Sequence, residues 1–315
     1  MEIVALAGGV GASKFLLGLS RVTDSRELTI IVNTGDDIVL HGLAISPDLD
    51  IVTYTLAGVV NSETGWGFTG ETFHALEQLA RFGSPSWFHL GDRDLATHIY
   101  RTAMMRSGAS LSEAAESIRQ ALGVQAKILP MSDQPVPTMI QTPEGRLNFQ
   151  EYLVQRRAEP VVLGISFEGI AQARPARDVL ESLEQAAGIV ICPSNPLISI
   201  GPILAVPGIR DALRKRRNNV VAICPIVGGK SLKGPSDRML AQLGFDVSAG
   251  SVARMYQDIC ATFVIDPVDA GETQAIEQLG MKAIIRKTVM NALKDKEQLA
   301  RDVLELFASK ATGAA

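Results

Sequence analysis

Short apolar runs rich in β-branched residues recur along the chain, and several lead through a polar turn into a segment with helical spacing. The first run, residues 2–7, is followed by a glycine turn and then by the apolar segment 15–19. A second run, residues 28–33, comes next. Strand, helix and strand in that order form the building unit of a parallel sheet. The pattern therefore predicts an α/β fold that begins with a βαβ unit.

The same alternation resumes in the second half of the chain. We expect strands at 161–165, 188–192, 220–224 and 262–265, helices near 177–186, 207–215 and 236–243, and a terminal helix from 288 to about 309. Regular alternation of this kind is typical of a sheet covered by helices on both sides. The predicted fold class is α/β, with a doubly wound, mainly parallel Rossmann-like sheet in a single domain, 1–315.

Residues 71–160 interrupt the alternation. Apolar residues are spaced three and four apart up to about residue 122, which indicates helices. Short β-like pieces then flank a turn at 143–145, which indicates a β-hairpin. We expect residues 71–160 to form an inserted helical and β-hairpin lobe that covers the active site.

Composition narrows the class of protein. With 315 residues, of which 46% are hydrophobic, the chain can bury a full core. No apolar window is long enough to span a bilayer, and the chain begins with a strand instead of a leader, so we expect a cytoplasmic protein without a membrane partner. The three cysteines lie far apart in apolar runs, which argues against a disulfide framework or a zinc site.

Charge argues against nucleic acid as a partner. The net charge is −4, and the basic cluster at 214–217 ends a predicted helix, where cations are favoured. The expected partners are small molecules.

The glycine turn at residues 8–14 carries the first candidate chemistry. Glycines such as Gly9 and Gly11 let the backbone take positive φ and let a ligand approach, and the first turn of the following helix attracts phosphate. Lys14 could reach a phosphate oxygen. The turn departs from the P-loop at Ser13 and from the dinucleotide fingerprint at Lys14, so a tight turn without a ligand stays an alternative.

Four carboxylates follow the glycine turn closely. Asp36 and Asp37 come after the second strand, and Asp48 and Asp50 lie in the next turn. Because ligands of parallel sheets collect at the carboxyl ends of the strands, these turns should neighbour the glycine turn. Each aspartate alone could cap a helix or close a turn. As a set they predict a Mg²⁺ site beside a phosphate, with Asp36 and Asp48 facing the metal.

Two further segments carry candidate chemistry. In the segment 91–94, Arg93 stands between aspartates and could fork to a phosphate, although the aspartates could also cap the following helix. His98 on that helix has the spacing of a packed residue. Trp66, between two glycines, could stack on a planar ring or form a hydrophobic lid.

Taken together, these motifs resemble the CofD family of 2-phospho-L-lactate transferases in coenzyme F420 biosynthesis, nearly from end to end. They are the segment 7–11 with Lys14, the segments 33–37, 46–50, 65–67 and 90–98, and the segments 193–196, 199–202 and 229–235. The resemblance implies transfer of a phospholactyl, phosphoenolpyruvyl or phosphoglyceryl group from a guanosine diphosphate-activated donor to the ribityl hydroxyl of the deazaflavin Fo. It also implies release of GMP and use of Mg²⁺.

The resemblance also implies roles for individual residues. Asp50 and His89 match positions associated with Fo binding, and His89 stands where relatives often carry lysine. Ser194 and Asn195, together with Gly229 and Lys230, match a guanine-nucleotide site, in addition to the glycine turn. We count Asp50, Asp36 and Arg93 as the candidate catalytic residues and Trp66 as a candidate substrate contact, and we consider a homodimer.

Two other functions compete with this transferase. The first is a non-catalytic regulatory protein that binds a nucleotide sugar, as in the related YvcK-like family of the same fold. The second is an NAD(P)-dependent dehydrogenase, which the missing third glycine disfavours. The presence of Asp50 and of the segment 91–94 favours the transferase.

Overall fold

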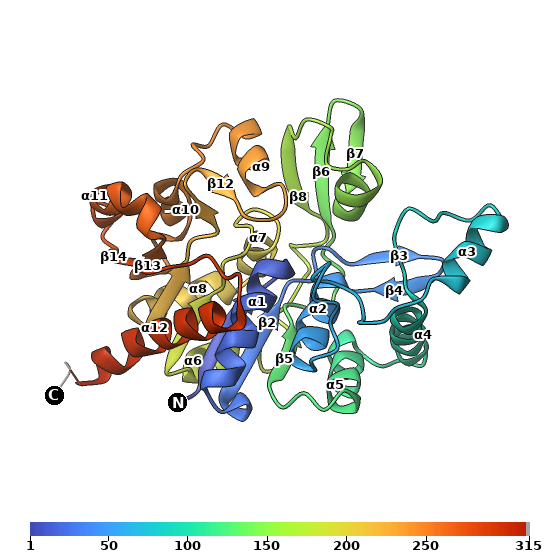
Figure 1. The fold of residues 1–315 in the computed structure, drawn as a ribbon, viewed down its shortest axis with the longest axis horizontal. Coiled ribbons are helices and arrows are strands. Elements are labelled where there is room, and N and C mark those ends of the chain that lie inside the picture. The colour runs from blue at the N-terminus through green and yellow to red at the C-terminus, as the bar shows by residue number, and fades with distance from the viewer. Residues whose placement is uncertain (313–315) are drawn as a thin grey trace.

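The computed structural model describes residues 1–312. Seven strands in this range form one parallel sheet: β1 (Ile3–Ala7), β2 (Leu28–Val32), β5 (Lys127–Pro130), β9 (Gly188–Ile191), β10 (Val220–Ile223), β13 (Thr262–Ile265) and β14 (Lys282–Ile285). Their order in space is β14-β13-β10-β9-β1-β2-β5 (Figure 1). This is the order of a doubly wound dinucleotide-binding sheet with one added strand, and it reverses direction between β1 and β9. The predicted doubly wound, Rossmann-like α/β fold is confirmed.

Helices cover both faces of the sheet (Figure 1). The first face packs against α6 (Val179–Gln185), α7 (Ile200–Ala205), α8 (Ile209–Lys215), α10 (Ala249–Tyr256) and α11 (Thr273–Glu277). The second packs against α1 (Gly9–Val22), α2 (Pro47–Leu56), α5 (Leu111–Ala121) and α12 (Leu293–Thr312).

Strand β1 explains this arrangement at the level of residues. Val4 and Leu6 belong to the core on the first face, whereas Ile3, Ala5 and Ala7 belong to the core on the second. Successive side chains of a strand point to opposite faces, so a strand buried on both faces reads as an unbroken apolar run. That is why the apolar runs of the sequence identify the central strands.

Smaller elements surround the carboxyl edge of the sheet. They are the hairpin β3 (Ile38–Leu40) and β4 (Leu43–Ile45), the helices α3 (His74–Arg81) and α4 (Asp92–Arg106), the sheet of β6 (Thr138–Thr142), β7 (Gly145–Asn148) and β8 (Gly164–Phe167), the hairpin β11 (Ile226–Val227) and β12 (Lys230–Ser231), and α9 (Ser236–Gln242). Short 3-10 turns lie at Ser25–Glu27, Arg217–Asn219 and Pro267–Glu272, and a π-helical turn lies at Glu151–Gln155.

The segment 71–160 differs from an insertion in one respect. Its strand β5 pairs in parallel with β2 and forms the edge of the central sheet. The segment therefore consists of a helical part before β5 and most of a small antiparallel sheet after it. The hairpin around 143–145 is present as β6 and β7.

Three sequence-based boundaries are wrong. The run at 161–165 is not a central strand, because β8 pairs with β6 and leaves Val161 and Leu163 exposed. The terminal helix begins at Leu293, not at residue 288. The segment 46–50 is not a plain turn, since α2 begins at Pro47 and carries Asp48 and Asp50 in its first turn.

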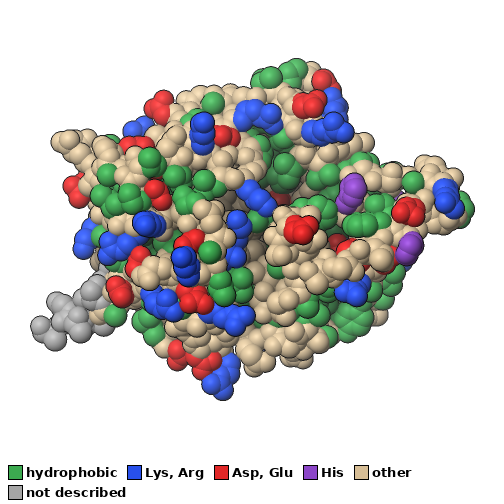
Figure 2. Space-filling model, in the orientation of Figure 1, with side chains coloured by type: hydrophobic (Ala, Val, Ile, Leu, Met, Phe, Trp, Pro, Cys, Tyr) green, Lys and Arg blue, Asp and Glu red, His purple; other side chains and the backbone are tan. Residues whose placement is uncertain are grey.

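Charged side chains of both signs lie on the surface. Acidic and basic side chains are interspersed over the face drawn in Figure 2, without a continuous basic area. No helix within residues 1–312 has the length and apolar character needed to cross a lipid bilayer.

Candidate functional site

A cavity of about 560 Å³ opens at the carboxyl ends of the central strands. Its walls come from the turns after β1, β2, β9, β10 and β14, from the first turn of α2, and from the loops at 66–67, 88–89 and 232–236. The crevice between β1 and β9 lies at its centre, where the strand order reverses. Open α/β sheets bind their ligands at this position.

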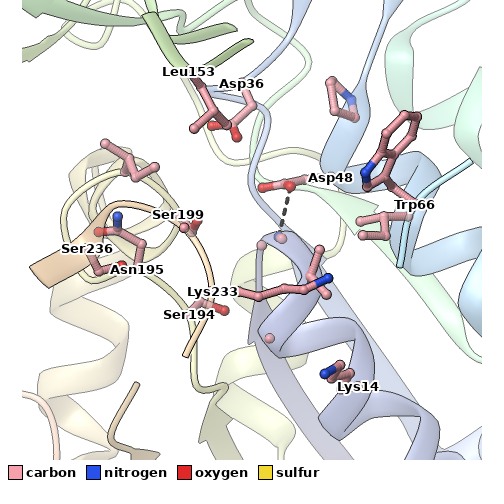
Figure 3. Close-up of a pocket in the computed structure, with 18 of the residues that line it drawn as sticks. Lys14, Asp36, Asp48, Trp66, Leu153, Ser194, Asn195, Ser199, Lys233 and Ser236 are labelled. Carbon is pink, nitrogen blue, oxygen red and sulfur yellow. Dashed lines mark hydrogen bonds between the residues drawn. The ribbon is translucent and has the colours of Figure 1, made fainter. Parts of the chain in front are cut away.

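The glycine turn forms the floor of the cavity. Gly9 has a φ of +72°, which a residue with a side chain rarely adopts, and it begins α1. Its backbone N–H donates to Asp48 Oδ1 at 2.8 Å (Figure 3). One amide at the positive end of α1 is therefore already bound by a carboxylate. A phosphate placed here would lie beside that carboxylate, and a cation between them would remove the repulsion.

Gly11 has a different role from Gly9. It lies within α1, and a Cβ atom added to it would be 2.3 Å from the Pro193 carbonyl oxygen in the turn after β9. The absence of a side chain lets α1 pack directly on that turn. Gly11 therefore fixes the width of the crevice in which a ligand would lie.

We expect Gly11→Ala to lower the free energy of unfolding by about 1–3 kcal/mol, because the added methyl group must displace backbone atoms in a closely packed contact. Gly271→Ala is the matched control, since a Cβ at that position meets no atom within 4 Å. Urea unfolding of both variants tests this expectation. Equal stability of the two would mean that α1 and the turn after β9 can separate at no cost.

Asp36 and Asp48 lie together near the glycine turn, joined by Asn33. The Asn33 side-chain amide donates to Asp36 Oδ1 and to Asp48 Oδ2, both at 2.9 Å. Burial, and next the charge of Asp48, raise the pKa of Asp36 well above its ordinary value. Burial likewise raises the pKa of Asp48 to about 6. Two buried carboxylates that resist ionisation together form a site where a cation is stabilising.

Asp50 belongs to a separate group. Its carboxylate accepts hydrogen bonds from both terminal nitrogens of the Arg101 guanidinium. Nη1 lies 3.1 Å from Oδ2, and Nη2 contacts Oδ1. The side chain of Arg101 is 1% exposed, so this forked pair is withdrawn from water. Such bidentate pairs fix the orientation of a carboxylate. Asp50 therefore faces the cavity in one orientation, while Arg101 lies behind it.

His98 extends this group along α4. Arg101 Nη1 lies 3.2 Å from His98 Nδ1, and because a guanidinium can only donate, Nδ1 is the acceptor. His98 Nε2 lies 3.5 Å from Asp94 Oδ1 and makes no hydrogen bond within residues 1–312. Tyr54 donates to that Asp94 oxygen, at 2.8 Å. Asp94 and His98 line the cavity beside Asp50, whereas Arg101 does not.

The same group meets the geometry of a metal site. Ligand atoms of Asp50, Asp94 and His98 all lie within 4.8 Å of one another, which is compatible with a metal ion. Mg²⁺ prefers oxygen ligands, whereas this set includes an imidazole, and Arg101 already compensates Asp50. The donor chemistry of Asp36 and Asp48 suits Mg²⁺ better.

Most of the sequence-predicted site residues line the cavity. These are Gly9, Gly11, Lys14, Asp36, Asp48, Asp50, Trp66, His89, Ser194 and Asn195. They come from the turns after β1, β2 and β9, from the first turn of α2, and from the two loops that carry Trp66 and His89.

Arg93, Gly229 and Lys230 are not among the lining residues. The Arg93 guanidinium is exposed and donates to the Thr69 carbonyl at 3.0 Å. Gly228 and Gly229 both have positive φ and form the two-residue turn between β11 and β12. The glycine pair is thus explained by the hairpin.

Sequence analysis missed several residues of the site, among them His98, which it assigned to packing and which lines the cavity. Asn33 follows β2 directly and holds the carboxylate pair. Arg101 could have been found, because Asp94, His98 and Arg101 recur at spacings of four and three, which puts them on one helix face. Lys233 lines the cavity, and nothing in the local sequence separates it from Lys230.

A comparison with protein families decides the identity of this arrangement. The family model described as 2-phospho-L-lactate transferase CofD matches residues 3–310. The chain belongs to the CofD family. The resemblance of the motifs is thereby confirmed over nearly the whole chain.

Relatives of this chain carry two different names. The chain is 39% identical over 305 residues to the 2-phospho-L-lactate transferase of Methanosarcina mazei, covering 97% of this chain and 100% of the relative. It is 44% identical over 312 residues to the phosphoenolpyruvate transferase of Streptomyces griseus, covering 97% and 98%. These relatives support a transferase role for this CofD-family chain.

Among solved structures, a UPF0052-family protein of Bacillus halodurans is similar, with a TM-score of 0.65 at 17% identity. The match covers 96% of this chain and 98% of that protein. At this identity the likeness supports the fold of the CofD-family chain and not its activity.

Proposed function

We propose that the protein transfers a phospholactate-type group from a guanosine diphosphate-activated donor to the ribityl hydroxyl of Fo, releasing GMP, in coenzyme F420 biosynthesis. The observation that carries the proposal is one cavity that gathers two chemically different groups of residues. The first joins the N-terminus of α1 to a buried carboxylate pair. The second joins the oriented carboxylate of Asp50 to Asp94 and His98, and aromatic side chains line the same cavity.

The donor is proposed to bind at the glycine turn and the turn after β9. Lys14 and the first turn of α1 suit its diphosphate. The Ser194 hydroxyl supports the nucleotide assignment, because the residue is only 4% exposed and its Oγ has no hydrogen-bond partner among residues 1–312. A nucleotide hydroxyl or phosphate oxygen would satisfy it.

Asp36 and Asp48 would hold the Mg²⁺. Their raised pKa values express the cost of two buried negative charges, and Mg²⁺ is commonly held by one or two carboxylates together with substrate phosphates. A bound Mg²⁺ would neutralise charge on the phosphoryl oxygens of the donor. Asn33 keeps the two carboxylates apart and oriented through its shared amide.

Asp50 is proposed to orient the acceptor. In the transfer, the hydroxyl oxygen of Fo forms a bond to the phosphorus that carries the three-carbon acid, and the bond from that phosphorus to the GMP oxygen breaks. The hydroxyl proton passes to the Asp50 carboxylate and from there to solvent, and GMP leaves with the bonding electron pair. A carboxylate that accepts the hydroxyl hydrogen bond holds the oxygen in line with the phosphorus. His89 and Trp66 line the same cavity and suit a planar ring.

The deciding experiment mixes the protein with Fo, Mg²⁺ and a guanosine diphosphate-activated donor and follows GMP by chromatography. Parallel reactions with lactyl, enolpyruvyl and glyceryl donors identify the three-carbon acid. We expect stoichiometric GMP and phosphorylated Fo product with at least one donor. Nucleotide-sugar binding without turnover of any donor would favour the regulatory alternative and overturn the proposal.

A further inference from the structure

Lys233 connects two distant parts of the cavity wall. It lies between β12 and α9, and its Nζ donates to the Thr64 carbonyl oxygen at 3.0 Å, across a sequence separation of 169 residues. Thr64 belongs to the loop at 61–67 that also carries Trp66. In Figure 3 the Lys233 side chain crosses in front of the first turn of α1 toward that loop.

The contact brings positive charges together at the end of α1. Burial lowers the pKa of Lys14 below its ordinary value, and the neighbouring ammonium of Lys233 adds to this shift. Neither lysine pairs with a carboxylate among residues 1–312. Two unpaired ammonium groups beside a helix N-terminus form a site for a multiply charged anion.

The Thr64 carbonyl is a weaker partner for Lys233 than a phosphate. The Lys233 ammonium is charged toward either partner, but a phosphate oxygen adds an attraction between opposite charges that the neutral carbonyl lacks. An anion on the glycine turn therefore draws Nζ toward α1. Once Nζ leaves hydrogen-bond distance of the Thr64 carbonyl, the loop at 61–67 is no longer linked to Lys233.

We propose that Lys233 couples donor binding to the loop at 61–67: it binds the donor diphosphate and thereby releases the loop that carries Trp66. The inference rests on the proposed function, since it takes the diphosphate of a guanosine donor as the anion. Trp66 is 44% exposed and lines the cavity, so its displacement reshapes a place where a planar ring could lie. The expected consequence is that the donor binds before the acceptor.

Tryptophan fluorescence can test this coupling directly. The chain has two tryptophans, so Trp87→Phe leaves Trp66 as the single reporter. GDP with Mg²⁺ is the probe. In this background we expect the Trp66 emission to change with the same dissociation constant that calorimetry gives for GDP. Adding Lys233→Met should weaken GDP binding about tenfold or more, as loss of a hydrogen bond to a charged group does, and should abolish the emission change even at saturating GDP.

Two further lysine variants test whether the effect of Lys233→Met comes from the loss of any positive charge or from the loss of this particular lysine. Lys215→Met removes an exposed charge at the end of α8, and we expect GDP affinity and Trp66 response like those of the Trp87→Phe protein. Lys230→Met tests the other lysine of the same segment. Loss of GDP affinity there, with Lys233→Met unaffected, would overturn the inference.

The remaining outcomes distinguish the inference from the proposed function. If GDP binds but Trp66 emission stays constant, or if Lys233→Met still gives the full response at saturation, the coupling is wrong and the donor assignment stands. If the Trp87→Phe protein binds no GDP at all, the donor assignment and the coupling fall together.

Discussion

Replacing Asp50 by asparagine is expected to slow transfer to Fo by about 10²-fold or more, the range typical of a positioned acid or base group. A primary hydroxyl is a weak nucleophile at neutral pH, and in a loose phosphoryl-transfer transition state it needs orientation above all. Asp50 can supply this, because Arg101 holds its carboxylate from behind while Asp50 itself lines the cavity. The asparagine keeps the size of the side chain and weakens the acceptor.

Single-turnover transfer to Fo and, separately, calorimetry of GDP binding would measure the two effects of Asp50→Asn. Donor affinity should barely change, which also shows that the variant is folded. Asp37→Asn is the matched control. Asp37 is one of the four aspartates that follow the glycine turn, but it does not line the cavity. A wild-type transfer rate in Asp50→Asn, or donor binding lost as completely as transfer, would remove Asp50 from the acceptor side.

The fold could be predicted from the sequence because the central strands are buried on both faces. Residues 3–7, 188–191 and 220–223 are apolar without interruption, and such runs are typical of parallel strands inside an α/β sheet. The glycine turn and the segment 33–37 could be predicted to meet, since both follow adjacent parallel strands. That reasoning needs only local pattern and chain order.

The run at 161–165 shows where this reasoning fails. This run is as apolar as a central strand, yet Val162 is its only fully buried residue. Val162 packs in the small hydrophobic cluster that contains Ile140 and Tyr152, not in the core of the central sheet. A short apolar run cannot say which sheet it joins, because pairing depends on partners far away in the chain.

The details of the site likewise depend on contacts between residues that are distant in the sequence. The forked pair between Asp50 and Arg101 joins residues 51 positions apart, so no local motif contains it. Lys230 and Lys233 differ only in their position relative to the hairpin turn of β11 and β12. The residues of a binding turn can therefore be nominated from sequence, whereas the choice among neighbouring lysines requires the structure.

We expect the metal to bind at the carboxylate pair of Asp36 and Asp48. Asp36→Asn keeps the hydrogen bond that Asp36 accepts from Asn33 and removes one of the two ionisable groups. The pKa of Asp36 is higher in the folded protein than in the unfolded chain, so at neutral pH this carboxyl lowers the stability of the fold. We therefore expect Asp36→Asn without metal to melt at or above the temperature of the wild-type protein.

Magnesium should reverse that order. A ligand that binds only the folded state raises the melting temperature, so Mg²⁺ should stabilise the wild-type protein and have little effect on Asp36→Asn or Asp48→Asn. We also expect Asp36→Asn and Asp48→Asn to transfer about 10²-fold more slowly or worse. The reason is that a bound metal contributes several kcal/mol of charge stabilisation to the transition state. Thermal melts with and without Mg²⁺ measure the stabilisation independently of activity. Asp37→Asn is the control for the Mg²⁺ effect, because burial also raises the pKa of Asp37 but this residue does not line the cavity. Equal stabilisation of Asp36→Asn and wild type by Mg²⁺ would place the metal elsewhere. Asp50, Asp94 and His98 would then be the next residues to replace, because their ligand atoms lie within 4.8 Å of one another.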